Sequence, residues 1–416
     1  MIFANDYKRA TDSETLEAAI ANRGADGIVV ISPRCSDVEP ERTHWLLDRA
    51  ILLPENTTIL LQNCTIKLSD KCRDNFIRSA NCGIGIEYPE RIKNIHIRGE
   101  GTCTLLGADH PRATGDGSKI LANPCPYDAE EIRRLGKWAP EQWHDYSYGT
   151  DVGKEGESQY GDWRGIGVLL ANVENFSIEN LRIVDSHGWG ISLEACAHGR
   201  VSRIEFDAHM HKMIDGLRSN MENQDGVDIR CGCHHIVISD ITGCTGDDIV
   251  ALTAYASPRY LPGGSMRTTH VMHNDWTKRE RDIYDIVIRN VVGYSAHCCM
   301  VRLLPVYSYI YNIVIDGIVD CAPPGQSNGC ALLLGELDGA YGENLPDSMR
   351  NIMISNVSSG GCHAINIAGY LTDSVITNVI YRGPSPDGFR YGRPGSAKNV
   401  SISNFIYACY QGPEGK

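Results

Sequence analysis

Three carboxylic acids at two turns are the residues of this chain most suited to chemistry. They lie in the segment from Asn223 to Asp248, NQDGVDIRCGCHHIVISDITGCTGDD. Asp225 in the first turn is 22 residues before Asp247 in the second, and Asp248 follows directly. If one coil of a parallel β-solenoid spans this distance, the two turns stack at the strand spacing of about 4.7–4.9 Å. The acids would then share one patch, and paired carboxylates can cleave a glycosidic bond by protonating the leaving oxygen and activating water.

Repeated strand-like units along the chain support a solenoid, in which a short strand and a turn recur in every coil. Each unit alternates β-branched residues, and the Asn, Gly or Ser that follows it suits tight and sometimes left-handed turns. The units start roughly 22 to 50 residues apart, so that a short gap is one bare coil and a long gap contains an inserted loop. They begin at Asn94, Asn175, Arg200, His235, Asp285, Asn312, Asn351, Asp373 and Asn399.

These units predict an all-β fold with one elongated domain over residues 1–416. A length of 416 residues suggests two or three globular domains, but a solenoid grows by stacking, and no Pro- or Ser-rich linker divides the chain. A β-sandwich is the alternative for many short strands. The similarity of the units to one another favours the solenoid.

The amino-terminal residues predict a helix that caps the solenoid. Thr11 and Glu14 have the spacing of a capping box, an apolar stripe follows, and Gly24 is a stop signal. We therefore expect a helix over residues 13–22, which would cover the core and strand edges that the first coil exposes. Strands that begin at Gly27, Thr57 and Cys64 would start the stack.

Three long segments interrupt the repeat, at residues 108–162, 208–222 and 254–281. Part of the first, from Tyr127 to Leu135, has helical character. Aromatic side chains on loops either pack the loop onto the solenoid or stack on the apolar faces of sugar rings, and the sequence leaves both roles open. The aromatic residues concerned are Trp138, Trp143, Tyr146, Tyr148, Tyr160 and Trp163.

Composition restricts the partners of the chain. The net charge of −13 argues against nucleic acid and anionic membranes, which attract basic patches, although a local basic cluster could still bind a polyanion. No apolar run approaches the roughly 20 residues that a membrane span requires. The sequence gives no indication of the oligomeric state.

The sixteen cysteines indicate the compartment only together with the first residues. The start MIFANDYKRATDSE has no basic, apolar and cleavage regions of a signal peptide, so we expect a cytoplasmic protein; removal of such a peptide from a secreted protein would reverse this inference. In the cytoplasm, reduced cysteines packed in the core are favoured over disulfides. Those within or beside the repeats are Cys196, Cys244, Cys298, Cys321, Cys330, Cys362 and Cys409.

The order of several motifs resembles glycoside hydrolase family 28, the polygalacturonase and rhamnogalacturonase group. The motifs are SHGWGISLEAC from Ser186, NQDGVD from Asn223, TGDDIVAL from Thr245 and a later histidine strand. That family shows Ser-Pro-x-Trp, Asn-Thr-Asp-Gly, Gly-Asp-Asp, Gly-His-Gly and Arg-Ile-Lys in this order, and the match covers roughly residues 166–367. The resemblance implies a single-stranded, right-handed parallel β-helix of the pectin-lyase type.

The resemblance also implies roles for the acids. Asp225 matches the acid of Asn-Thr-Asp, and Asp247 and Asp248 match the paired aspartates. By this resemblance Asp247 is the general acid, and Asp225 and Asp248 hold and deprotonate water in an inverting hydrolysis. Such a mechanism requires carboxyl groups about 6.5–9.5 Å apart. Like charges in the cluster would raise a neighbour's pKa and keep one acid protonated near neutral pH.

The chain departs from the family at two motifs. His297 matches the Gly-His-Gly histidine but has Ala296 and Cys298 as neighbours, so it is either a catalytic partner or a histidine held by the backbone. The segment GCALLLGELD from Gly329 has no basic residue where the family has Arg-Ile-Lys, which is associated with the uronate carboxylate. Recognition of galacturonate is therefore in doubt.

Other residues could bind the substrate near these motifs. Arg302 could either bring a positive charge to the cleft or pair with Glu336 or Asp338 on the following coil. Glu336 could hydrogen-bond sugar hydroxyls, which would suit a neutral or deoxy sugar. Asn223 and Trp189 belong to the matching motifs and complete the set of candidate substrate-binding residues.

Histidines and cysteines also form metal-like groups, and we expect no metal or other cofactor from them. The groups are His209 with His211, His270 with His273, and the segment from Cys231 to His235. None has the paired spacing of a structural zinc site, and in a strand Cys231 and Cys233 would both point into the core. Calcium is a separate possibility, because pectate lyases of the same general fold use it.

The leading hypothesis is an inverting glycoside hydrolase that removes the ends of a pectin-like or related oligosaccharide or polysaccharide. A polysaccharide lyase or epimerase on the same fold would need a Lys, Arg, Tyr or His base beside the acids. A noncatalytic carbohydrate-binding solenoid is the third hypothesis, since Asp is common in turns. Mutual repulsion between the adjacent Asp247 and Asp248 favours a chemical role.

Overall fold

The computed structural model describes most of the chain outside the inserted segments. The described residues are 1–72, 74–83, 85–86, 88–111, 162–208, 211–214, 217–221, 223–255, 269–272, 279–323, 329–336, 344–383, 385–392 and 395–408. The helix expected from Tyr127 to Leu135 and the aromatic side chains between Trp138 and Tyr160 lie outside these ranges. Trp163 lies inside them, is fully buried and contacts Arg78, so it packs the fold.

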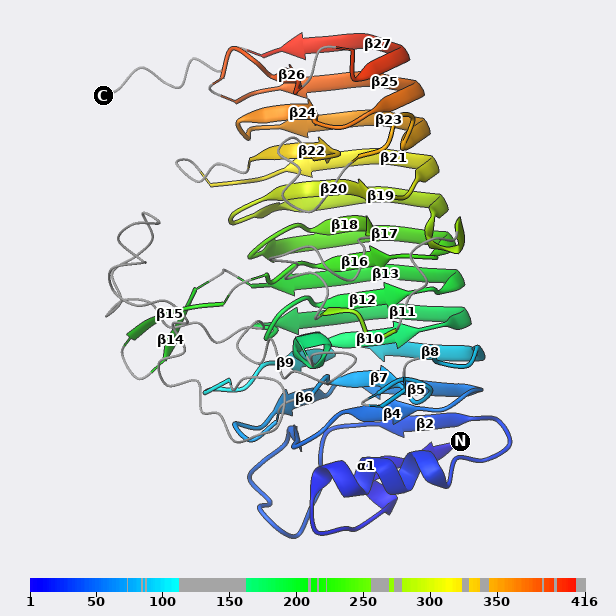
Figure 1. Ribbon diagram of the computed structural model, residues 1–416. Helices are drawn as coiled ribbons and strands as arrows, with labels where there is room; N and C mark the ends of the chain where they lie inside the picture. Colours follow the sequence, from blue (N-terminus) through cyan, green and yellow to red (C-terminus); the bar gives the residue numbers. More distant parts are fainter. Residues whose placement is uncertain are drawn as a thin grey trace, which may run out of the picture.

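Two large parallel sheets run the length of the described structure, and one strand of each belongs to every central coil (Figure 1). Neighbouring strands pair in register, so that Val201, Ile238 and Ile288 lie side by side on three successive coils. This arrangement confirms the predicted right-handed parallel β-helix.

The strands alternate between the two sheets along the chain. The main path of the first sheet contains β1 (Ile2–Phe3), β2 (Ile28–Ile31), β5 (Thr57–Gln62), β8 (Ile92–Glu100), β11 (Val173–Val184), β13 (Ala197–Asp207), β17 (His234–Thr245), β19 (Ile283–Ser295), β21 (Ile310–Asp320), β23 (Met349–Ser359), β25 (Leu371–Tyr381) and β27 (Ala397–Tyr407). The second contains β4 (Ile51–Leu53), β7 (Ile77–Ser79), β10 (Val168–Ala171), β12 (Ile191–Glu194), β16 (Val227–Arg230), β18 (Val250–Tyr255), β20 (Cys299–Val306), β22 (Cys330–Leu334), β24 (His363–Ile367) and β26 (Phe389–Tyr391). All the repeat units predicted from the sequence lie in the first sheet.

Short elements complete the described structure. They are β3 (Trp45–Leu47), β6 (Thr65–Leu68), β9 (Thr104–Leu106), the 3-10 helices η1 (Ala4–Asp6), η3 (Asp162–Gly165) and η5 (Arg279–Arg281), and the antiparallel pair β14 (His211–Ile214) and β15 (Leu217–Asn220). β3, β6 and β9 pair with one another and with the second half of β11, so the long strands cover two faces of the solenoid. The predicted insertion at 208–222 therefore contains the hairpin β14–β15, which projects from the stack (Figure 1).

The chain turns the first corner of the coils at residues in the left-handed conformation. Their φ angles lie between 48° and 59°, and register places them above one another, one in each coil. This first-corner ladder consists of Asn56, Asn94, Asn175, His198, His235, Asp285, Asn312, Asn351, Asp373 and Asn399. The Nδ2 atom of Asn175 donates to Oδ1 of Asn94 (2.6 Å), and Nδ2 of Asn94 donates in turn to Oδ1 of Asn56 (2.6 Å). Asn and Asp suit these corners because they tolerate left-handed backbone and satisfy each other's polar atoms.

Apolar side chains fill the interior of the coils. One continuous cluster extends from Leu16 in the amino-terminal cap to Tyr381 in β25. The second sheet is also buried on its outer side, since all described residues of β10, β12, β16 and β18 are buried. Polar side chains on that outer side are therefore held under other segments of the chain.

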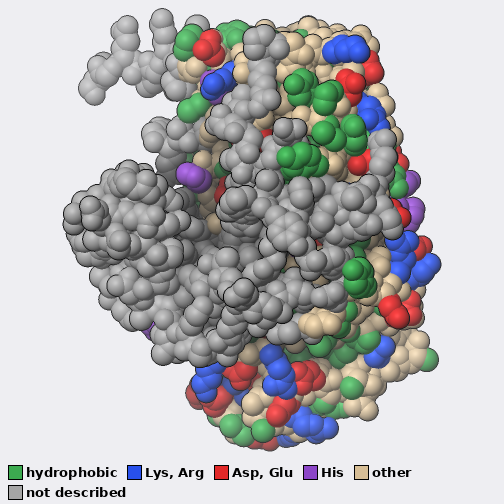
Figure 2. Space-filling view, viewed as in Figure 1, with side chains coloured by type: hydrophobic (Ala, Val, Ile, Leu, Met, Phe, Trp, Pro, Cys, Tyr) green, Lys and Arg blue, Asp and Glu red, His purple; other side chains and the backbone are tan. Residues whose placement is uncertain are grey.

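The predicted amino-terminal cap is present as α1 (Asp12–Ala21), displaced by one residue from the expected 13–22. Thr11 accepts a hydrogen bond from the Glu14 amide, and the Glu14 carboxylate accepts one from the Thr11 amide, which forms the predicted capping box. Charged side chains of both signs gather at this end of the solenoid (Figure 2).

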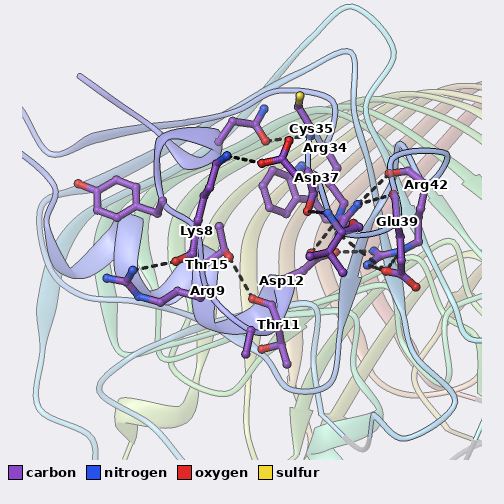
Figure 3. Close-up of a pocket in the computed structure, with 16 residues that line it drawn as sticks. Lys8, Arg9, Thr11, Asp12, Thr15, Arg34, Cys35, Asp37, Glu39 and Arg42 are labelled. Atoms are coloured by element: carbon purple, nitrogen blue, oxygen red, sulfur yellow. Dashed lines mark hydrogen bonds and ion pairs between the residues drawn. The ribbon is translucent and has the colours of Figure 1, made fainter.

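A polar cluster attaches the cap to the first coil. The buried Asp12 carboxylate accepts hydrogen bonds from Arg34 (2.8 Å), Arg42 (2.5 Å) and the Leu46 amide (2.8 Å). Asp12, Arg34 and Arg42 line a cavity of about 130 Å³ between α1 and the segment that follows β2 (Figure 3). Burial opposes ionisation of Asp12, but the hydrogen bonds from Arg34 and Arg42 outweigh it and lower its pKa. The cluster thus has a structural explanation.

Most described cysteines are free and buried, including Cys196, Cys244 and Cys330. The core prediction was wrong for Cys321, which is exposed because β21 ends one residue earlier. Cys409 lies outside the described residues. Cys231 and Cys233 lie in the turn after β16 and pack into two different clusters, so the prediction that both point the same way was also wrong.

No helix among the described residues is long and apolar enough to cross a membrane.

We predict that Asp12→Asn lowers the free energy of unfolding by about 2–4 kcal/mol near neutral pH, because it removes the anion that the buried Arg34 donates to and one of the two carboxylates paired with Arg42. The pKa of Asp12 is lowered in the folded state. Its contribution is therefore present above the unfolded pKa of about 3.9 and is lost as the pH falls through the folded pKa. Urea unfolding at several pH values, followed by circular dichroism, measures both effects.

Asp37→Asn is the matched control, because the Lys8–Asp37 pair is exposed at the same cap. It should leave the unfolding curve unchanged. Equal stability of the two variants would contradict the role given to Asp12.

Candidate active site

The three acids predicted from the sequence meet at the turns that lead into the second sheet. Asp225 precedes β16, and Asp247 and Asp248 precede β18. The pairing of Val227 with Val250 places Asp225 beside Asp248 on the next coil. Carboxylate oxygens of the three residues lie within 4.8 Å of one another. The one-coil spacing of the sequence therefore produces the expected patch.

Backbone hydrogen bonds fix the two turns against each other. The Gly226 amide donates to the Asp248 carbonyl (2.8 Å), and the Gly246 amide donates to the Gln224 carbonyl (3.0 Å). The side chain of Gln224 is buried and donates from Nε2 to the Ser186 carbonyl (2.8 Å), one coil below. Gln224 thus holds the acid-bearing turn in place. Its position next to Asp225 is the one sequence feature that could have pointed to this role.

Gly226 allows the close approach of these coils. A Cβ atom at this position would lie 2.4 Å from the Ile249 carbonyl oxygen and 2.9 Å from the Phe206 ring. Both neighbours belong to the packed core, so moving either of them would destabilise the fold. Any larger residue here would push Ile249 away and separate Asp225 from Asp248.

Burial raises the pKa of two of the three acids. Asp225 and Asp248 are 7% and 3% exposed, whereas Asp247 is partly exposed. Burial, followed by repulsion from the neighbouring aspartates, raises the pKa of Asp225 well above its ordinary value. Burial and the charge of Asp247 raise the pKa of Asp248 to about 6, against the opposing effect of Arg302. The protons are therefore shared across the group.

A fourth carboxyl, Asp228, adjoins the cluster and was not selected from the sequence. It is 1% exposed, and neither side-chain oxygen has a hydrogen-bond partner among the described residues. Burial raises its pKa well above the ordinary value, although Arg230 opposes this, and Asp247 and Asp248 add repulsion. The alternation of Asp228 and Arg230 with apolar residues in β16 was a signal that this outer face is polar.

Arg302 compensates part of this negative charge. It lies in β20, and its guanidinium donates to Oε2 of Glu336 (2.8 Å) and lies 3.8 Å from Oδ2 of Asp248. Of the two roles left open by the sequence, the structure shows the pairing with Glu336 together with an approach to Asp248 in the acid cluster. Asp338, the other suggested partner, lies outside the described residues. The Arg302–Glu336 pair lies where the resemblance would require a basic Arg-Ile-Lys segment.

The other predicted site residues occupy different environments. His297 is exposed in the turn before β20, one coil beyond Asp247, and its amide donates to Ser295 Oγ (3.3 Å). Asn223 is partly exposed, with a left-handed φ of 52°, in the turn that carries Asp225. Both residues therefore lie close in sequence or in register to the acids and remain candidates for substrate contact.

Trp189 differs from the sequence-based expectation. It is 3% exposed, and the guanidinium carbon of Arg230 lies 4.5 Å from its ring centroid. A ring packed in this way has no open face for a sugar, because the apolar core and a cation already occupy its surroundings. Trp189 therefore has a packing role beneath the site.

Arg230 also connects the second sheet to the segment 269–272. It donates to Nε2 of His270 (2.6 Å), whose Nδ1 lies 2.9 Å from the Glu194 carboxylate. Because arginine can only donate, Nε2 of His270 accepts and Nδ1 donates. Burial and Arg230 lower the pKa of His270 to about 4, which agrees with a neutral ring. His270 is thus bound within the fold, and its suggested metal partner His273 lies outside the described residues.

Thiols border the cluster on the next coil. The Cys299 amide donates to Oδ1 of Asp248 (3.0 Å), and the sulfur atoms of Cys299 and Cys330 lie 3.4 Å apart. Ligand atoms of Asp248, Cys298 and Cys299 are close enough together to hold a metal ion, as are those of the three aspartates. The aspartate group has the oxygen ligands that Ca²⁺ prefers, and the mixed group would suit a softer metal.

The arrangement can both donate and accept protons at one point of the surface. The cluster combines two buried acids whose pKa values are raised with a third, Asp247, that is partly exposed. Acid and base catalysis on one glycosidic bond requires a protonated and an ionised group side by side. The closest oxygens, within 4.8 Å, are nearer than the 6.5–9.5 Å separation of carboxyl groups in typical inverting enzymes. The stereochemistry of a reaction here is therefore a useful measurement.

Comparison with known proteins identifies the same fold elsewhere. No protein-family model and no curated protein matches this sequence. Among solved structures, an exopolygalacturonase from Thermotoga maritima matches with a TM-score of 0.50 and 16% identity, over 97% of this chain and 91% of that chain. Endo-xylogalacturonan hydrolase from Aspergillus tubingensis matches with a TM-score of 0.50 and 13% identity, over 95% of this chain and 89% of that one.

A binding protein has a similar likeness. PfbA, a surface adhesin of Streptococcus pneumoniae, matches with a TM-score of 0.50 and 11% identity, over 97% of this chain and 84% of that chain. At these identities the similarity establishes the fold, and function has to be argued from the site. The parallel β-helix fold implied by the sequence motifs is confirmed.

We predict that Asp248→Asn stabilises the protein by on the order of 1–3 kcal/mol at about pH 8 and has little effect at about pH 5. The raised pKa of Asp248, about 6, means that its stabilising contribution is present below the unfolded pKa and is lost as the pH rises through the folded value. An asparagine can still accept the Cys299 amide hydrogen bond. Thermal unfolding of both proteins across this pH range measures the difference.

A pH dependence that is the same in wild type and variant would mean that Asp248 ionises freely in the folded protein. Asp373→Asn is the control, because Asp373 occupies a first-corner position where asparagine is the common residue.

Proposed function

We propose that this protein is a glycoside hydrolase that cleaves a glycosidic bond in a pectin-like or related oligosaccharide. The observation that carries the proposal is the group of Asp225, Asp247 and Asp248, whose oxygens lie within 4.8 Å at stacked turns. A structural turn has no need of three crowded acids, because their repulsion and burial oppose folding at neutral pH. Protonation of a leaving oxygen together with activation of water does require them.

Exposure supports a division of roles within the group. Asp247 is the only one of the three that is not buried, so it is best placed to reach the glycosidic oxygen of a substrate. Asp225 and Asp248 lie beneath it as neighbours in register and can hold a water molecule between them. We assign Asp247 as the proton donor, supplied from the protons that the cluster shares, and Asp225 and Asp248 as the groups that orient water and accept its proton when they are ionised, in an inverting reaction.

The charges around the cluster support a neutral or deoxy sugar at the subsite next to Arg302. A uronate needs a cation whose hydrogen bonds are available to its carboxylate. Here Arg302 donates to Glu336 and lies 3.8 Å from Asp248, so its guanidinium is already paired with carboxylates of the chain. A carboxylate at this subsite would meet repulsion, whereas hydroxyl groups could bond to Glu336.

The covered outer face of the second sheet supports action at chain ends. The side chains of β12, β16 and β18 are buried, and His270 attaches the segment 269–272 to Glu194 beside them. A substrate therefore has no long open groove along these described strands. A pocket that accepts the end of an oligosaccharide fits this geometry better than a cleft that binds the middle of a polymer.

We predict that Asp247→Asn lowers the rate of hydrolysis of a cleavable oligosaccharide by about 10³-fold or more, because the variant has no acidic proton to donate. Pectic, rhamnogalacturonan and neutral oligosaccharides serve as candidate substrates. Mass spectrometry of the wild-type products should show the addition of one water, without the ultraviolet absorbance of unsaturated sugars. Unsaturated products would indicate a lyase and overturn the proposal.

Asp240→Asn is the matched control for this variant. Asp240 is an exposed corner residue of β17 in the same coil, with a hydrogen bond from Asn290, and its substitution should leave the rate unchanged. Proton NMR of the first product gives the anomeric configuration. Inversion is expected, and retention would make one aspartate a nucleophile.

We predict that Glu336→Gln shifts specificity toward uronate-containing oligosaccharides. Removal of the Glu336 charge leaves the guanidinium of Arg302 with excess positive charge, and one charge-assisted hydrogen bond to a carboxylate corresponds to about a 10-fold to 100-fold preference. The ratio of kcat/KM for a galacturonide to that for a neutral analogue should rise accordingly. A fall in both values without a change in their ratio would show that Arg302 does not face the substrate.

A further inference from the structure

The first-corner ladder, which otherwise consists of Asn and Asp, has histidine at two successive coils. Eight of its ten positions are Asn or Asp, whereas β13 and β17 contribute His198 and His235. Histidine tolerates the left-handed conformation but cannot continue the chain of amide hydrogen bonds that links Asn56, Asn94 and Asn175. A local rule broken twice in adjacent coils marks this corner as a candidate functional site.

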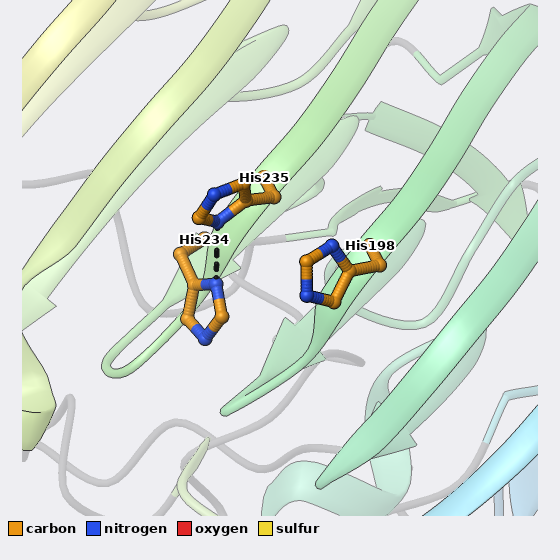
Figure 4. Close-up of side chains that lie close together, drawn as sticks. All are labelled: His198, His234 and His235. Atoms are coloured by element: carbon orange, nitrogen blue, oxygen red, sulfur yellow. Dashed lines mark hydrogen bonds between the residues drawn. The ribbon is translucent and has the colours of Figure 1, made fainter.

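A third histidine completes a cluster at this corner. His234 precedes His235, and their Nδ1 atoms lie 2.8 Å apart. Register places His198 next to His235, with ring centroids 4.8 Å apart. Figure 4 shows the three rings together at the edge of the strands. One nitrogen from each ring lies within 4.8 Å of the other two, and all three residues are at least partly exposed.

We propose that His198, His234 and His235 form a binding site for a divalent transition metal ion such as Zn²⁺. Imidazole nitrogen suits Zn²⁺, Cu²⁺ and Ni²⁺, and each nitrogen would bind Zn²⁺ at about 2.0–2.1 Å. Small rotations of exposed rings are enough to bring nitrogens within 4.8 Å to that distance. Three protein ligands leave a fourth tetrahedral position for water or for a donor from another molecule.

Neighbouring side chains favour this geometry. Nε2 of His235 lies 3.4 Å from the Asp285 carboxylate on the next coil, so that a carboxylate orients the ring from the side opposite to His234. Metal-binding histidines commonly have such a carboxylate behind them. Tyr284 stacks on His234, with centroids 4.8 Å apart and planes 8° apart, and Tyr311 continues the stack. His234 is thus held in place before a metal arrives.

Charged side chains beside the cluster are already paired with one another. Glu174 pairs with Lys93 and Arg91 on the preceding coils and reduces the positive charge near His198.

The cluster is separate from the acids. His234 and His235 begin β17 at the carboxyl end of the second-sheet strand β16, whereas Asp225 lies at the amino end of β16. The sequence offered only the two adjacent histidines of the segment from Cys231 to His235. His198 is 36 residues earlier and becomes their neighbour only through the register of β13 with β17.

Titration calorimetry of untagged protein with Zn²⁺ tests the proposal. We expect one tight equivalent, and Co²⁺ should give the visible absorption of a tetrahedral site with nitrogen ligands. The key variant is His198→Asn with His235→Asn, because asparagine restores the common residue of the ladder and should preserve the fold. It should weaken the tight equivalent at least 10-fold.

His363→Asn is the control, since His363 is a partly exposed histidine of β24 outside the cluster. It should keep the tight equivalent. Wild-type protein without such an equivalent, or equal affinity in wild type and the double variant with unfolding unchanged, would overturn the proposal. The measurement needs no substrate, so its result is independent of the proposed hydrolase function.

Discussion

In-register stacking of parallel coils is the constraint on which the rest of this structure depends. Each coil turns at a residue in the left-handed conformation, and the amide ladder of Asn56, Asn94 and Asn175 shows how these corners bond to one another. Fixed corners fix the register, and the register places residues from successive coils about 4.7–4.9 Å apart. Chemistry in such a fold arises from what the sequence puts at equivalent positions of neighbouring coils.

Stacking is favourable for amides and apolar side chains and unfavourable for like charges. Asp225 and Asp248 are neighbours in register, and their burial raises both pKa values instead of separating the coils. The fold tolerates this because backbone hydrogen bonds at Gly226 and Gln224 do not depend on the acids, and because Arg302 supplies positive charge. Repulsion and burial at this site destabilise the folded state locally, and the rigid scaffold around it keeps the acids together. This is expected where function opposes stability.

Local pattern made the strands, the cap and the acid patch predictable. The alternation of β-branched residues predicts each strand, and the 22-residue interval predicts that two turns stack; both patterns can be read within one coil. Thr11 and Glu14 specify where the helix starts. Roles that depend on contacts between coils separated by insertions were not predictable. His198 acquires its neighbours only through the register of two coils with an insertion between them, and the partners of Arg302 depend on side-chain conformation.

The two clusters of this molecule show how one rule produces different sites. At the turns into the second sheet no amide ladder is required, so acids can accumulate there and burial shifts their protons. Most first-corner positions are Asn, whose side chain can hydrogen-bond to the next corner. A histidine there stands in place of a residue that stabilises the stack. For this reason His198 and His235 are stronger evidence of function than an equally exposed pair on a strand would be. The other ladder positions show that Asn or Asp is expected there, and histidine is the exception.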